Sequence, residues 1–212
     1  MVLAIGGDSI ANGAGPANGV NEYQYVSYRG PLYQALTSAG ATVTMVGTNS
    51  TPVRDNLGPT VHSAQGGAML DTSPSVTSIS QLMDNLKAAY PNGPYDNWVY
   101  VLEGGTNNIY TYNPTEIAAK WATIIQKEQT LFPGSTLVMV GMMPASWISA
   151  SFYSAINPVL AAHDNGGKLI DALMGNAGLT TTDYMADATH LSKAGSVKAG
   201  NWIAQRIIAR MK

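Results

Sequence analysis

Five short apolar segments alternate along the chain with longer segments that have helical periodicity, and this alternation limits the fold more than any other feature. The short segments cover residues 2–5, 42–47, 98–102, 136–141 and 168–170. The helical segments cover residues 31–39, 76–90, 114–132, 151–165 and 193–211. Strands that alternate with helices pair in parallel and carry helices on both faces of the sheet. The sequence therefore predicts an α/β fold with a five-stranded parallel sheet and a functional site at the carboxyl ends of its strands.

Length and charge indicate a single domain and narrow the range of partners. The 212 residues contain no repeat and no linker that divides them into two halves, so we expect one domain over residues 1–212. The net charge is −2 and the Lys and Arg residues are scattered singly, which argues against nucleic acid as a partner. No apolar run approaches the roughly 20 residues of a membrane helix, so we expect no membrane partner.

The sequence leaves the cellular compartment open. The first residues lack the basic and apolar regions of a signal peptide, which fits an intracellular protein or a mature chain or domain cut from a longer secreted one. We favour the extracellular alternative slightly, and we allow that the chain is part of a larger multidomain protein. The chain has no Cys, so it forms no disulfides and has no thiol nucleophile.

Three loops that follow predicted strands or lie near the C-terminus carry residues suited to acyl transfer. Glycines before Ser9 allow a sharp turn that leaves its hydroxyl at the sheet edge. Asn107, in the Gly-rich loop after residues 98–102, has an amide that can donate a hydrogen bond to an oxyanion. Asp187 precedes His190 by three residues, so one loop can hold a base and the acid that orients it.

Other polar residues are candidates for substrate binding. Residues 48–75 are rich in Gly, Pro, Asn, Ser and Thr, and so long a connection without regular structure is expected to be functional. His62 lies in this stretch and is expected to bind substrate rather than to act as the base, because no carboxylate partner is evident near it. Arg29 is expected either to pin the first helix or to hold the loop beside Ser9, and Asn108 is a further candidate contact.

The order of these motifs resembles the four sequence blocks of the SGNH (GDSL-type) hydrolases. The matching segments run along nearly the whole chain and are Gly7-Asp8-Ser9, the loop with Gly67, Gly105-Thr106-Asn107-Asn108 and Asp187-Ala188-Thr189-His190. Within that superfamily the chain looks most like carbohydrate esterases of family 3, the acetylxylan esterase type. The segments that carry this second resemblance are Ser27-Tyr28-Arg29-Gly30-Pro31-Leu32-Tyr33, Val46-Gly47 and His62-Ser63-Ala64-Gln65-Gly66-Gly67.

The resemblance implies a role for each matching residue. Ser9 is the nucleophile, His190 the base and Asp187 its orienting acid, while the oxyanion hole consists of the Ser9 and Gly67 backbone N–H groups and the Asn107 side chain. It further implies a three-layer α/β/α fold like that of flavodoxin, with no metal and no organic cofactor. Two departures are present: the third block usually ends in Asp where this chain has Asn108, and Ser63-Ala64 replaces a Glu-Gly pair in the second.

These roles predict a serine esterase that hydrolyses short acyl esters through an acyl-enzyme, with an acetylated carbohydrate as the expected substrate. Two alternatives remain open. A lipolytic esterase or thioesterase would use the same residues with a different pocket. A carbohydrate-binding module would keep the fold without turnover. A fold alone does not identify the substrate.

Overall fold

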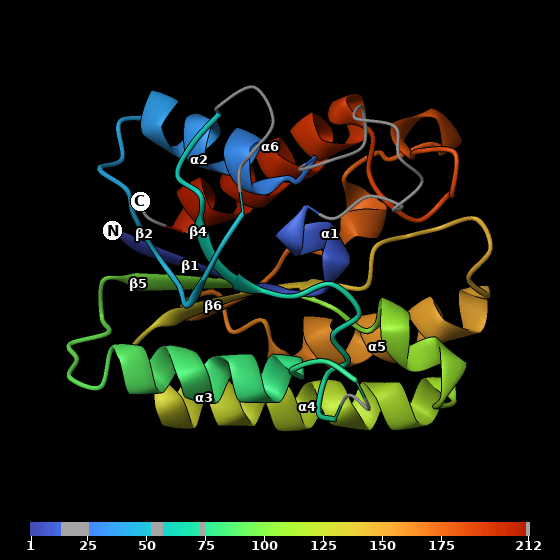
Figure 1. Cartoon of the computed structure of the whole chain (residues 1–212), viewed down its shortest axis with the longest axis horizontal. Helices are drawn as coiled ribbons and strands as arrows, with labels where there is room; N and C mark the ends of the chain where they lie inside the picture. The colour runs from blue at the N-terminus through green and yellow to red at the C-terminus, as the bar shows by residue number, and fades with distance from the viewer. Residues whose placement is uncertain (14–25, 52–56, 73–74, 211–212) are drawn as a thin grey trace.

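A computed structural model describes residues 1–13, 26–51, 57–72 and 75–210, and in it a central sheet lies between two layers of helices (Figure 1). Helices α2 (Arg29–Ser38) and α6 (Lys193–Arg210) cover one face. Helices α3 (Ile79–Ala89), α4 (Pro114–Leu131) and α5 (Ala150–His163) cover the other face. The three-layer α/β/α fold expected from the sequence is thereby confirmed.

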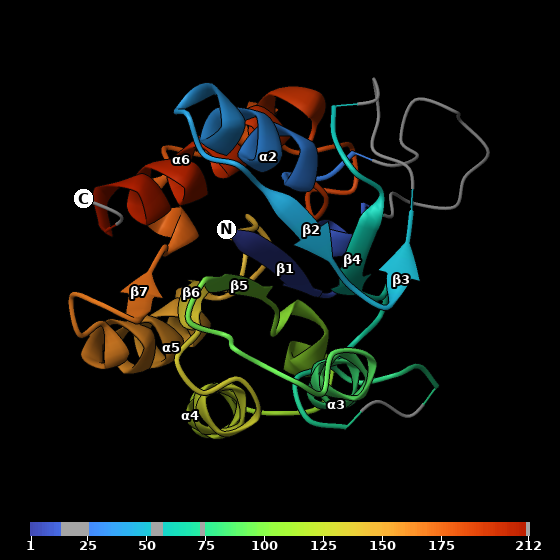
Figure 2. The same cartoon turned by 90° about the vertical axis from the view of Figure 1, so that its left-hand side faces the viewer.

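The sheet is built around β1, which pairs in parallel on both of its sides (Figure 2). Its strand order is β3-β4-β1-β5-β6-β7, and β2 also pairs with β1. The strands are β1 (Val2–Gly7), β2 (Thr44–Val46), β3 (Asn49–Ser50), β4 (Val61–Ala64), β5 (Trp98–Glu103), β6 (Thr136–Gly141) and β7 (Leu169–Asp171). The N-terminal half of β1 pairs with β2 and its C-terminal half with β4, so these two strands share one position in the sheet.

All five predicted strands are present, but among the described residues the sheet has seven strands rather than five and is not wholly parallel. The two further strands, β3 and β4, lie within the stretch 48–75, where no regular structure was expected, and they pair with one another antiparallel. Residues 52–56 and 73–74 of that stretch lie outside the described residues. The sequence of β4 gave no strand pattern because two polar residues, His62 and Ser63, occupy its centre and both are buried. Pairing with β1, rather than the alternation of side chains, makes this segment a strand.

Short helical turns occupy several of the remaining connections. They are α1 (Ser9–Asn12), η3 (Thr106–Tyr110), η4 (Met174–Asn176) and η5 (Thr181–Asp183). The five long helices agree with the predicted segments to within a few residues. Capping residues and prolines at helix ends are recognisable in the sequence. For α4, Pro114 stands in the first turn and Asn113 with Glu116 forms a capping box.

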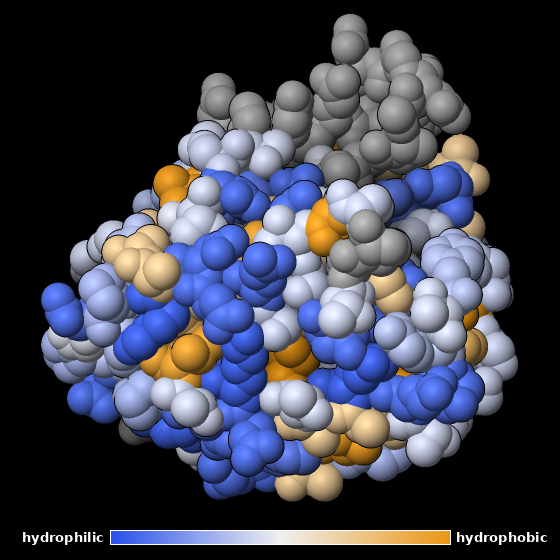
Figure 3. All heavy atoms as spheres, turned by 60° about the horizontal axis from the view of Figure 1, so that its bottom comes forward, coloured by the Kyte–Doolittle hydropathy of each residue, from blue (hydrophilic) through white to orange (hydrophobic). Residues whose placement is uncertain are grey.

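A separate hydrophobic core fills the space on each face of the sheet. Side chains that alternate along β1 divide between the two cores: Ala4 faces α3 and α4, whereas Leu3 and Ile5 face α2 and α6. On the outer face that carries α3 and α4, hydrophilic residues predominate and hydrophobic patches are small and separate (Figure 3). None of the helices in the described ranges combines the length and the apolar composition needed to cross a membrane.

One ionisable side chain, Glu128 of α4, lies buried within this apolar packing. Only 1% of its surface is exposed, and Ser135 Oγ donates a hydrogen bond to its carboxylate at 2.6 Å. Burial raises the pKa of Glu128 to about 7, although the Ser135 hydrogen bond acts in the opposite direction. The folded protein therefore holds a proton on Glu128 at pH values where the unfolded chain releases it.

We expect Glu128→Gln to change how stability depends on pH. Because the folded pKa is raised, the stabilisation from Glu128 is complete below its ordinary pKa of 4.5 and is lost as pH rises through about 7. Relative to the variant, the natural protein should lose about 3 kcal/mol of unfolding free energy between about pH 4 and pH 8.

Urea denaturation of both proteins at the two pH values measures this difference. Glu116→Gln, at the exposed start of the same helix, controls for removal of a carboxylate and should show little of the effect. A constant difference between the natural protein and Glu128→Gln at both pH values would contradict the prediction.

Candidate active site

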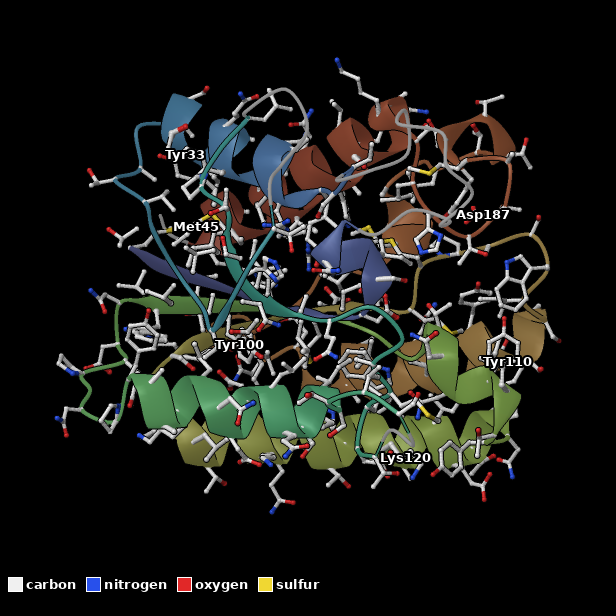
Figure 4. The ribbon with its side chains drawn as sticks, viewed as in Figure 1. Tyr33, Met45, Tyr100, Tyr110, Lys120 and Asp187 are labelled. Atoms are coloured by element: carbon white, nitrogen blue, oxygen red, sulfur yellow. The ribbon has the colours of Figure 1, made fainter. Side chains whose placement is uncertain are left out.

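The carboxyl ends of β1, β5 and β7 lie at one end of the parallel sheet, and the segments that follow them carry the candidate residues. Ser9 follows β1, Asn107 follows β5, and the loop with Asp187 and His190 precedes α6. Figure 4 shows Asp187 and Tyr110, from two of these loops, at the same end of the molecule. Parallel strands bring their carboxyl ends together, so residues distant in sequence gather there.

The turn after β1 fixes the position of Ser9. Gly7 packs so closely against β5 that a Cβ atom there would lie 2.8 Å from the Glu103 carbonyl oxygen and 2.7 Å from the Ala11 Cβ. Only glycine fits this position without displacing backbone. Asp8 then caps α1, its side chain accepting a hydrogen bond from Ile10 N at 3.0 Å. Ser9 is thus the first residue of α1 and remains partly exposed.

A hydrogen-bonded chain joins Ser9, His190 and Asp187. His190 Nε2 lies 2.8 Å from Ser9 Oγ, and His190 Nδ1 lies 2.5 Å from Asp187 Oδ2. In the tautomer that carries its hydrogen on Nδ1, this atom donates to the carboxylate. Nε2 then accepts a hydrogen bond from the Ser9 hydroxyl. The structure therefore brings together the three residues expected to act as nucleophile, base and orienting acid. This is the arrangement that activates a serine hydroxyl for nucleophilic attack.

The loop around Asp187 holds its carboxylate ionised. Asp187 Oδ1 accepts hydrogen bonds from the backbone N–H groups of Thr189 and His190, each at 3.0 Å. Burial raises the pKa of Asp187, but these bonds and the one from the His190 ring outweigh it and leave the pKa below its usual value. Ala188 adopts a φ of 55°, which is rare for a residue with a side chain and turns the loop back on itself.

The expected oxyanion donors come from the three loops that meet beside Ser9. Asn107 Nδ2 donates to the Ala68 carbonyl oxygen at 3.0 Å and makes a longer contact of 3.4 Å with Asp8 Oδ2. Gly67 is exposed with a φ of 77°, and no described residue accepts a hydrogen bond from its N–H. The Ser9 N–H belongs to the first residue of α1, so no carbonyl oxygen of that helix accepts a hydrogen bond from it. All three donors stand at the turn that carries the Ser9 hydroxyl.

The three expected substrate-binding residues are buried, which corrects their interpretation as contacts to substrate. Asn108 has no exposed surface, and its Oδ1 accepts a hydrogen bond from Leu70 N at 2.9 Å. It therefore ties the loop with Gly67 to the loop with Asn107. The bond to Leu70 N uses only an oxygen acceptor, which an amide and a carboxylate both supply, whereas Asn108 Nδ2 is buried without a hydrogen-bond partner among the described residues.

Arg29 and His62 are buried on the other side of α1. The Arg29 guanidinium donates to backbone carbonyl oxygens of Ala11, Asn12, Thr51 and Thr60 at 2.8–3.3 Å, so it pins α1 to the chain around β3 and β4. Burial lowers its pKa to about 10. Of the two roles that the sequence left open, this is the holding of the segment beside Ser9, because α1 carries Ser9, and not the pinning of the helix predicted over residues 31–39.

His62 takes part in the same internal network. Its Nδ1 accepts from Ala64 N at 3.1 Å and its Nε2 lies 2.9 Å from Thr51 Oγ1. Burial, together with the charge of Arg29, lowers the pKa of His62 to about 3, so the ring is neutral at physiological pH. No proton shuttles through a buried ring with this pKa, and His62 is therefore no rival to His190 as the base.

Sequence reasoning missed Glu103, the last residue of β5. Its side chain is fully buried beside Asp8, and Glu103 Oε2 accepts a hydrogen bond from Asp8 N at 3.3 Å. Burial raises the pKa of both carboxyl groups, and the charge of Asp8 raises that of Glu103 further. Glu103 therefore keeps its proton to a higher pH than an exposed carboxyl group does, in contact with the residue that precedes Ser9. A charged residue at the end of an apolar strand was the signal that could have identified it.

Several solved structures share this fold over nearly the whole chain. A family 3 carbohydrate esterase of Clostridium thermocellum has a TM-score of 0.75 and 22% identity over 98% of this chain and 95% of its own. An acetyl esterase variant with acetate ion has a TM-score of 0.72 and 16% identity over 98% and 96%. A lipolytic G-D-S-L family protein of Veillonella parvula has a TM-score of 0.59 and 13% identity over 99% and 98%.

These likenesses confirm the predicted fold, which the chain shares with a family 3 carbohydrate esterase and with a G-D-S-L family protein. No family model and no curated protein sequence matches the chain. Within the described residues, no group of three or more His, Asp or Glu side chains is arranged to hold a metal ion.

Proposed function

We propose that the protein is a serine esterase that removes acetyl groups from hydroxyls of a carbohydrate. The observation that carries this proposal is the unbroken chain from Ser9 Oγ through His190 to Asp187, with distances of 2.8 and 2.5 Å. The names of two similar structures, a carbohydrate esterase and an acetyl esterase, support the choice of substrate. Their low identity makes that choice a proposal about chemistry rather than a consequence of the fold.

Acylation would begin with attack of Ser9 Oγ on the ester carbonyl carbon while its proton moves to His190 Nε2. Asp187, ionised and bonded to Nδ1, stabilises the imidazolium that forms. The oxyanion accepts hydrogen bonds from the Ser9 and Gly67 N–H groups and from Asn107 Nδ2, whose long contact of 3.4 Å with Asp8 Oδ2 it replaces while the bond to Ala68 O is kept. The intermediate collapses with cleavage of the bond to the alcohol oxygen, which takes the proton from His190 Nε2.

Deacylation would repeat these steps with water as the nucleophile. His190 Nε2 takes a proton from the water as it attacks the acetyl group on Ser9, and the same three donors hold the second oxyanion. Breakdown of this intermediate returns the proton to Ser9 Oγ and releases acetate. The residues assigned to the reaction supply every proton transfer, so the scheme needs no cofactor.

Hydrolysis of p-nitrophenyl esters of acetate, butyrate and octanoate distinguishes this proposal from the lipolytic alternative. We expect kcat/KM to be largest for acetate and to fall with chain length. A maximum at octanoate would favour a lipolytic esterase or thioesterase, to which the similarity with the G-D-S-L protein also points. No turnover of any ester by a folded protein would contradict the esterase and favour the carbohydrate-binding alternative.

A further inference from the structure

Two exposed aromatic side chains lie beside the candidate triad and stack on one another. Tyr110 and Trp147 are 75% and 40% exposed, and they are the exposed aromatic residues of the described ranges. Their ring centroids are 6.0 Å apart and their planes differ by 20°. Tyr110 ends η3, three residues after Asn107, whereas Trp147 follows β6. Apolar rings left in water at a site of this kind indicate a binding surface.

The Trp147 ring is tied to the loop of the triad. Trp147 Nε1 donates to Thr189 Oγ1 at 2.9 Å, and Thr189 Oγ1 donates to the Asp187 carbonyl oxygen at 3.1 Å. Thr189 stands directly before His190 in the chain. The stacked pair is therefore held at a fixed place relative to His190, on the side from which the imidazole approaches Ser9.

A pocket of about 330 Å³ opens next to Trp147, a size at the lower end of the range for small-molecule sites. Its walls are Pro144, Ala145, Ser146, Leu179, Thr180, Thr181, Tyr184 and Ala188. None of these side chains is charged, so the pocket suits a neutral ligand.

The direction of proton transfer indicates which part of a bound ester, the alcohol or the acyl group, lies next to this pocket. His190 must protonate the leaving oxygen, so the alcohol lies on the His190 side of Ser9 while the carbonyl oxygen lies toward Gly67 and Asn107. Ala188, which stands between Asp187 and His190 in the chain, lines the pocket, so the pocket borders the loop that carries His190. The pocket and the aromatic pair therefore face the alcohol and not the acyl group.

We propose that the Tyr110–Trp147 pair and the adjoining pocket form the subsite for the leaving alcohol, and that this alcohol is a neutral pyranose ring. The C–H face of a pyranose packs against an aromatic ring, and its hydroxyl groups pair with exposed hydroxyls of the pocket such as those of Ser146 and Thr181. The inference rests on the proposed esterase function, and its kinetic test depends on that function. Its binding test does not depend on catalysis.

The kinetic test compares fully acetylated methyl xylopyranoside with ethyl acetate, whose alcohol is too small to reach the aromatic pair. We expect Tyr110→Ala to lower the preference in kcat/KM for the pyranoside over ethyl acetate by about tenfold, which is about 1.4 kcal/mol. Tyr33→Ala, on α2 and remote from the triad in Figure 4, is the matched control and should leave the preference unchanged. An unchanged preference in Tyr110→Ala would overturn the subsite while leaving the esterase intact.

The binding test uses Ser9→Ala, which cannot turn over, and unacetylated xylo-oligosaccharide as the probe. We expect the sugar to quench tryptophan fluorescence in this protein, and the quenching to disappear when Trp147→Phe or Tyr110→Ala is added. Quenching that survives both additions, or no quenching with the pair intact, would overturn the proposal. Because this readout needs no catalysis, failure of the esterase function and failure of the subsite give different results.

Discussion

Ser9→Ala should lower kcat/KM for p-nitrophenyl acetate by about 10⁶-fold, because the acyl-enzyme cannot form without the hydroxyl. The residual rate over water comes from the oxyanion donors and from substrate binding, which the change leaves in place. Stability should change little, since Ser9 is partly exposed and its hydroxyl has the His190 ring as its partner. Initial rates with circular dichroism and thermal melts of both proteins measure the two effects.

The control for this prediction is Ser38→Ala, at the exposed end of α2, which should keep full activity. If Ser9→Ala retained more than about a hundredth of the natural rate while folded, the nucleophile would be another group and the assignment of Ser9 would be wrong.

Asp187→Asn should lower kcat for the same ester by about 10⁴-fold and change KM little. The new amide nitrogen can take the place of the oxygen that faces His190 Nδ1, where it donates instead of accepting. His190 must then carry its hydrogen on Nε2, the atom that has to accept the Ser9 proton. Because Asp187 does not contact the substrate in this mechanism, the effect falls on the chemical steps and not on binding.

The matched control is Asp84→Asn, which removes an exposed carboxylate from α3 and should have no effect on kcat. A rise in KM with an unchanged kcat in Asp187→Asn would show that this residue binds substrate instead of orienting the base. Steady-state kinetics of the three proteins distinguish these results.

Short-range sequence patterns were enough to predict the strands and helices. They were also enough to predict pairs of residues that lie only a few positions apart in the chain. Strands such as β5 and helices such as α4 carry their own periodicity and caps, so their existence followed from the sequence. The same holds for Asp187 and His190, because a turn of three residues is enough to bring the carboxylate to the ring. The roles of these residues in catalysis remain predictions.

Contacts between distant segments decided the rest. Ser9 and His190 are 181 positions apart, and only the order of strands in the sheet places them 2.8 Å from each other. Arg29 and His62 were candidates for substrate binding, yet both are buried because unpaired backbone carbonyls and N–H groups around α1 and β4 need partners.

The sequence by itself determined the α/β fold class, because this depends on local periodicity, and it indicated the candidate triad through the order of motifs that resembles the SGNH hydrolases. Only the tertiary structure decided which polar residues face a substrate and which hold the loops together. The physical reason is that burial depends on what the remaining chain packs around a residue, and no local pattern contains that information. Trp147 and Tyr110 illustrate this, since their stacking joins two loops that lie far apart in the chain.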